Sequence, residues 1–189
     1  MKCGKLTTTI LGHILFAGMV LTSASGAVFN SLDWLPVTSS INISFDAIQS
    51  EFGAGGAYEG YRHATLQETT DLATGFGYSF SATPEENSAA IEDLHSFLGT
   101  TAFRTLPYYQ FSTLGYTADG TRFDIRLVMI DVNTPATWQG DVYETNYGFF
   151  DLSNAEIGHY LVQSVPEPAQ LALLMGVGSL LLVLHRKRR

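Results

Sequence analysis

The sequence predicts a mainly β fold for residues 28–164, an antiparallel sheet or a β-sandwich that carries one helix. Three observations lead to this fold class. Polar and apolar residues alternate over several short segments, which is typical of half-buried strands. Glycine, asparagine and aspartate separate these segments, as they do at turns. One segment has the apolar spacing of a helix, so we expect one domain with a single helix.

The alternation is clearest on the two sides of the tripeptide Ala118-Asp119-Gly120. Residues 110–117 precede it and residues 121–131 follow it, and a glycine after an aspartate between two alternating segments predicts a β-hairpin. The second segment places Phe123, Ile125, Leu127 and Met129 on one face, and Arg122, Asp124 and Arg126 on the other. Further strands are expected at residues 40–45, 58–70, 75–81, 141–151 and 155–164.

Residues 84–98 form the predicted helix. Thr83 supplies an N-cap hydroxyl, Pro84 stands at the first helical position, and Glu86 follows three residues after the cap, which together make a capping box. Gly99 suits the C-terminal cap. The apolar stripe of this helix consists of Ala90, Ile91, Leu94, Phe97 and Leu98. We expect this stripe to pack against the sheet.

Residues 1–27 have the three regions of a secretory signal peptide. Two lysines precede an apolar stretch, which is followed by small residues up to Ala27. We expect signal peptidase to cut after Ala27, so that Val28 becomes the N-terminus. An uncleaved anchor is the alternative, although the apolar stretch is short for a bilayer span. Cys3 is the one cysteine and leaves with the leader, so the mature chain has no disulfide and no thiol nucleophile.

A second apolar stretch, residues 169–184, contains no charged residue. A helix of this length rises about 24 Å, somewhat less than the about 30 Å hydrocarbon core of a bilayer, and can span it with local thinning. Residues 185–189 form a basic tail, and positive charge beside a transmembrane helix favours the cytoplasmic side. The charged residues of this tail are Arg186, Lys187, Arg188 and Arg189. We therefore expect a single-pass transmembrane helix that leaves residues 28–164 exported.

The tripeptide Pro166-Glu167-Pro168 lies between the predicted domain and this helix. The prolines fix the backbone and lack an N–H donor, so we expect the segment to be extended and exposed. A Pro-Glu-Pro motif, an apolar helix with small residues and a terminal basic cluster, in this order, resemble the PEP-CTERM sorting signal of exported proteins of Gram-negative bacteria. The resemblance covers residues 165–189. The alternative is an ordinary C-terminal anchor in which the prolines are accidental.

The resemblance implies that an exosortase, a membrane-embedded cysteine protease, recognises Pro166, Glu167 and Pro168. The chain would then cross the inner membrane only transiently and end at the cell surface or in the extracellular matrix. Proteins with this signal are typically associated with exopolysaccharide or biofilm. Exosortase, and an exopolysaccharide as a ligand, are therefore expected partners.

The charge of residues 28–164 is strongly negative. They contain seventeen Asp and Glu against four arginines and have no lysine. Nucleic acid is excluded as a partner, because its binding depends largely on basic side chains. We attribute the acidity to solubility, with cation binding as the alternative.

Four residues around one loop are candidate calcium ligands, because they carry the carboxylate and amide oxygens that Ca²⁺ prefers. They are Asp131, Asn133, Asp141 and Glu144. Their spacing fits no EF-hand, so an ordinary polar loop without a metal is the favoured interpretation. Trp138 in the same loop is either a packing residue or a platform on which a sugar stacks.

No catalytic motif is found in the sequence, including those of serine hydrolases, zinc proteases and P-loop proteins. His63, His95 and His159 are widely spaced, and each is expected to be a structural histidine. The favoured function is therefore a non-enzymatic, exosortase-processed surface or matrix protein without a cofactor. The alternative is a secreted carbohydrate-active or other extracellular enzyme.

Overall fold

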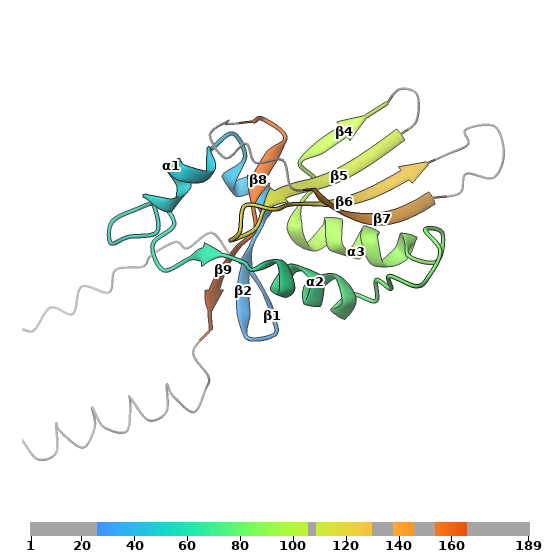
Figure 1. The fold of residues 1–189 in the computed structure, drawn as a ribbon, viewed down its shortest axis with the longest axis horizontal. Helices are drawn as coiled ribbons and strands as arrows, with labels where there is room; N and C mark the ends of the chain where they lie inside the picture. Colours follow the sequence, from blue (N-terminus) through green and yellow to red (C-terminus); the bar gives the residue numbers. More distant parts are fainter. Residues whose placement is uncertain (1–25, 106–108, 130–137, 146–153, 166–189) are drawn as a thin grey trace, which may run out of the picture.

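The computed structural model describes residues 26–105, 109–129, 138–145 and 154–165 (Figure 1). Almost all of the predicted signal peptide lies outside these residues, as do the predicted sorting motif, the apolar stretch 169–184 and the basic tail. None of the helices within the described ranges is long and apolar enough to cross a membrane.

The described part is mainly β, as predicted, and its strands form two sheets. The smaller sheet is antiparallel, and its strands in spatial order are β1 (Ala27–Phe29), β2 (Leu32–Leu35), β9 (Leu161–Ser164) and β3 (Arg62–His63). The larger sheet has the order β4 (Ala102–Arg104), β5 (Tyr109–Tyr116), β6 (Arg122–Met129) and β7 (Trp138–Thr145). A fifth strand, β8 (Ile157–His159), pairs with β5 in parallel.

The predicted hairpin is confirmed as β5 and β6, which pair from Tyr109 opposite Met129 to Tyr116 opposite Arg122. Asp119 shapes the turn, because its Oδ1 accepts bonds from the Thr117 hydroxyl at 2.6 Å and from the Thr121 N–H at 3.1 Å. The alternation also gives one buried face as predicted: Phe123, Ile125 and Leu127 all lie in the main core.

The helix α3 (Ser88–Leu98) covers that buried face (Figure 1). Its buried apolar residues are Ala90, Ile91, Leu94 and Leu98. The capping box is formed, since Glu86 accepts from the Thr83 N–H at 2.8 Å and Thr83 Oγ1 accepts from the Glu86 N–H at 3.3 Å. However, residues 84–87 form turns, so the α-helix begins four residues later than predicted.

The prediction of a single helix was wrong. The described residues also contain η1 (Val37–Ser40), α1 (Phe45–Gln49) and α2 (Leu66–Gly75). The predicted strand 40–45 is the end of η1 and the start of α1, where Ser44 is the N-cap. The predicted strand 75–81 is not formed: Gly75 ends α2, and turns and irregular backbone follow it.

The strand predicted at residues 58–70 is present only as β3, and residues 66–70 instead form the first half of the helix α2. Thr65 caps it and forms a second capping box with Glu68, whose N–H donates to Thr65 Oγ1 at 3.2 Å. The threonines inside the helix satisfy their hydroxyls locally; Thr70 Oγ1, for example, donates to the Leu66 carbonyl at 2.9 Å. Such bonds and the cap outweigh the β-propensity of threonine, on which the strand prediction depended.

The strand predicted at residues 155–164 is divided into β8 and β9 by Tyr160. This residue is fully buried, and its hydroxyl donates to the carbonyls of Phe123 at 3.1 Å and Thr113 at 3.3 Å. β8 belongs to the larger sheet and β9 to the smaller one. The end of the described chain therefore joins the two sheets.

Candidate functional site

The structure brings together two histidines that the sequence analysis treated separately. His63 Nε2 and His159 Nδ1 lie 3.0 Å apart, although 96 residues separate the two positions. His63 is in β3 and His159 in β8, and the pairing of His63 with Leu161 in β9 places them side by side. The sequence contains no signal for this contact, because it depends on the pairing of short strands from opposite ends of the domain.

The hydrogen bonds of His159 fix the tautomers of the pair. His159 Nε2 lies 3.0 Å from the Ile43 carbonyl oxygen, which can only accept, so Nε2 carries the proton. His159 Nδ1 then has a lone pair and accepts from His63 Nε2. By the same logic His63 Nδ1 is unprotonated and remains as a hydrogen-bond acceptor.

Both imidazoles are neutral at physiological pH. Burial, and then the neighbouring His159, lowers the pKa of His63 to about 4. Burial also lowers the pKa of His159 below its ordinary value. The surroundings are aromatic: Phe45 stacks on the His63 ring at 4.4 Å between centroids, and Phe52 meets its edge at 5.2 Å.

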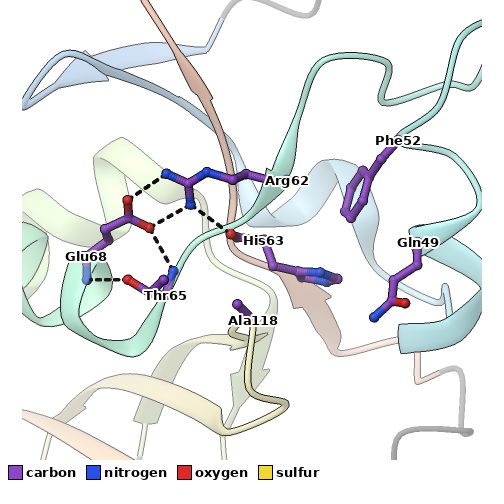
Figure 2. A pocket seen from close by; sticks show the side chains of 7 residues that line it. All are labelled: Gln49, Phe52, Arg62, His63, Thr65, Glu68 and Ala118. Carbon is purple, nitrogen blue, oxygen red and sulfur yellow. Dashed lines mark hydrogen bonds and ion pairs between the residues drawn. The ribbon is translucent and has the colours of Figure 1, made fainter.

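A surface cavity of about 540 Å³ opens beside His63 (Figure 2). On one side, Arg62 and Glu68 form an ion pair through two bonds of 2.6 and 2.8 Å. On the other side lie Phe52 and the exposed Gln49, with the His63 ring between the two sides. The cavity therefore combines a neutral imidazole, an aromatic ring and a closed ion pair.

Glu68 is held in its ionised form. The hydrogen bond from Arg62 is the main cause that lowers the pKa of Glu68 to about 2, and the Thr65 N–H, at 2.8 Å, adds to it. A carboxylate with so low a pKa cannot act as a general acid near neutral pH. The cavity can therefore accept hydrogen bonds at His63 and stack an apolar group on Phe52, which suits binding more than proton transfer.

The third histidine lies apart from this pair. His95 is buried on α3, its Nε2 is 3.2 Å from the Ile125 carbonyl oxygen, and burial lowers its pKa. This contact ties the helix to β6.

The structure separates the two described calcium candidates. Asp141 and Glu144 are three residues apart on β7, so their side chains point to opposite faces. Asp141 Oδ1 accepts from the Tyr78 hydroxyl at 3.0 Å and from the Val142 N–H at 2.8 Å. Asp131 and Asn133 lie outside the described residues. Within the described ranges, no group of three or more histidine, cysteine or acidic side chains could hold a metal ion.

Trp138 begins β7 and is partly buried, with its ring centroid 5.8 Å from that of Phe111. It packs against the main core. Of the two roles predicted for Trp138, packing is the one that these contacts support.

Both predicted processing points adjoin the smaller sheet. Ala27, the expected end of the signal peptide, opens β1 opposite Trp34. Val165, directly before the predicted sorting motif, donates its N–H to the Ser31 carbonyl at 3.0 Å. Pro166, Glu167, Pro168 and the basic cluster lie outside the described residues.

No protein-family model, curated protein or solved structure was found to match the chain.

Proposed function

We propose that the chain is an exported protein that an exosortase processes at Pro166-Glu167-Pro168. After removal of residues 1–27 and of the C-terminal tail, residues 28–164 act without catalysis at the cell surface or in the extracellular matrix of a Gram-negative bacterium. Before processing, the helix expected at residues 169–184 holds the chain in the inner membrane.

The observation that carries this proposal is the position of the first and last strands. β1 and β9 flank the same strand, β2, in the smaller sheet. β9 ends at Ser164, two residues before Pro166, and Val165, the last residue that the structure describes, donates its N–H to the Ser31 carbonyl. Cleavage at the two predicted points would therefore trim the chain at the borders of its sheet and leave nearly all of its pairing intact.

The state of the carboxylates supports a role without catalysis. A glycosidase needs two carboxyl groups that face the scissile bond, one of them an acid with a raised pKa. In the cavity beside His63 the one lining carboxylate, Glu68, is paired with Arg62 and has its pKa lowered to about 2. That cavity thus offers no carboxyl pair for such a reaction.

The decisive experiment replaces Pro166, Glu167 and Pro168 by alanine in the native host. We expect the variant to accumulate as a membrane-bound chain that keeps residues 169–189, because only recognition by the protease is lost. Mass spectrometry of the wild-type surface form should show a chain that begins at Val28 and lacks the tail. The single variant Gln170→Ala, two residues beyond the motif, is the matched control and should be processed normally. If the wild type also keeps its tail, the proposal fails.

One observation favours an extracellular enzyme as the second candidate. His63 is neutral and opens onto the cavity, and His159 would orient it as a general base. A purified chain that releases sugars or acids from the polysaccharide of its host, and a His63→Gln variant that does not, would establish this function instead.

A further inference from the structure

A second cavity lies on the face of the larger sheet that points away from α3. Because side chains alternate along β6, Arg122, Asp124 and Arg126 share this face, while Phe123 and Ile125 point to the core. The cavity has a volume of about 230 Å³ and is also lined by residues of β4, β5 and the segment before β8. Pockets for drug-sized ligands start at about 300 Å³, so this cavity suits one small group, such as a single sugar ring.

This cavity gathers positive charge in a domain that is otherwise acidic. Three of the four arginines in residues 28–164 line it. Arg104 forms an ion pair with Glu156, which leaves no net charge there. Arg122 and Arg126 both bind one carboxylate, that of Asp124. The five side chains together carry an excess of one positive charge, which favours an anionic ligand.

The arrangement around Asp124 is incompletely satisfied without a ligand. Arg122 and Arg126 each donate through Nη2 to the same oxygen, Oδ2, at 2.9 Å. The side chain of Asp124 is fully buried, yet its Oδ1 has no hydrogen-bond partner, and neither has the buried Nε of Arg126. A buried acceptor and a buried donor without partners are costly, so this cluster offers sites for both a donor and an acceptor from outside.

We propose that this cavity binds a uronic acid residue of an acidic polysaccharide. The carboxylate of the sugar pairs with the guanidinium of Arg126, and a sugar hydroxyl donates to Asp124 Oδ1. Arg126 is one-third exposed and lies 4.5 Å from the ring centroid of Tyr143, so it can turn toward a ligand while the ring still supports it. Gln110 and Ser112 add neutral polar groups to the lining, which suit the remaining hydroxyls.

This inference names a ligand for the matrix role proposed above and rests on that role for its biological setting. Binding is nevertheless measured on the purified chain, and exosortase processing is measured in the host. A failure of either proposal is therefore seen separately from a failure of the other.

The test is calorimetric titration of the full-length chain, purified in detergent, with trigalacturonate. We expect binding that is absent with the neutral galactose trisaccharide, because only the uronate carries carboxylates. The variant Arg126→Gln should weaken binding about tenfold or more, as expected for the loss of a charged hydrogen-bond partner. Arg62→Gln removes an arginine from the other cavity and is the matched control, with unchanged affinity expected.

A second variant keeps the test independent of folding defects. Glu156→Gln removes the negative charge that neutralises Arg104, so it should tighten uronate binding by about twofold to fivefold. Equal binding of the neutral trisaccharide, no heat at millimolar trigalacturonate, or an unchanged affinity of Arg126→Gln would overturn the proposal. Equal binding of sulfate would reduce the cavity to a general anion site.

Discussion

His63 donates its Nε2 proton to Nδ1 of His159 across 3.0 Å, inside a cluster of aromatic rings. His159 in turn donates its Nε2 proton to the Ile43 carbonyl oxygen, and the chain of hydrogen bonds ends there. The pair is therefore a chain of two neutral imidazoles. Protonation of His159 has to break its bond from His63, whereas His63 can take up a proton at Nδ1.

The first prediction is that the chain loses stability as the pH falls from about 7 to about 5. The pKa of His63 is lowered from its ordinary value of 6.5 to about 4 in the folded state, so the unfolded state binds the proton first. The free energy of unfolding then falls as the pH drops below the pKa of the histidine in the unfolded chain. The decrease is at most about 1.4 kcal/mol per pH unit for each such histidine. Glu68 contributes mainly below this range, because its stabilisation is lost as the pH falls from its ordinary pKa of 4.5 to the lowered pKa of about 2.

Urea unfolding at several pH values measures this slope. His63→Gln removes one titrating group. The slope of the unfolding free energy against pH should therefore decrease by the equivalent of about one bound proton, whatever the effect of the variant on stability at neutral pH. Gln49→Ala changes an exposed, non-titrating residue of the same cavity and should leave the slope as in the wild type. A His63→Gln slope equal to that of the wild type would contradict the buried neutral pair.

The second prediction concerns the start of α2. Thr65→Ala removes the hydroxyl that accepts from the Glu68 N–H at 3.2 Å, so the free energy of unfolding should fall by about 1 kcal/mol. Thr65→Ser keeps the hydroxyl and should be nearly neutral. Chemical denaturation of the two variants distinguishes a helix from the strand that the sequence analysis predicted here, because a strand would gain nothing from a capping hydroxyl.

The third prediction concerns the contact of β7 with α3. A Cβ at Gly140 would lie 2.6 Å from Ile91 Cγ1 and 2.9 Å from the Asn87 carbonyl oxygen. Gly140→Ala should therefore lower the free energy of unfolding by about 1 to 3 kcal/mol, as overpacking does. Gly53→Ala is the control, since nothing lies within 4 Å of its Cβ position. Equal melting temperatures for these two variants would place α3 further from β7 than the structure does.

The fourth prediction is that chelators leave the melting temperature unchanged. Asp141 uses Oδ1 to accept from Tyr78 and Val142, and Glu144 points to the opposite face of the strand. Thermal unfolding with calcium and with a chelator should give the same midpoint. A calcium-dependent rise of several degrees would instead indicate a site that includes Asp131 and Asn133.

The sequence predicted those elements whose signal is local. The hairpin of β5 and β6 followed from alternation around Asp119 and Gly120, and α3 followed from its apolar stripe and the Thr83 capping box. The helix α2 was missed because its threonines favour strands by composition, while the second capping box, Thr65 with Glu68, was not used.

The candidate site could not be predicted in the same way. His63 meets His159 only because β3 pairs with β9 in one register, and neither strand has a pattern that fixes its partner. Asp124 was assigned to a polar face with Arg122 and Arg126, and these do share a face. However, the alternation contains no information that a carboxylate on that face is fully buried.

The central place of β9 in the smaller sheet also limits the order in which the domain can fold. β9 pairs with β2 on one side and with β3 on the other, so two of the three pairings in that sheet use the last of the described strands to be synthesised. Such contacts between distant parts of a chain form slowly, because a long loop must close first. The domain therefore cannot complete this sheet until residues 161–164 have been synthesised, and the smaller sheet stays incomplete in a chain that is still emerging from the ribosome.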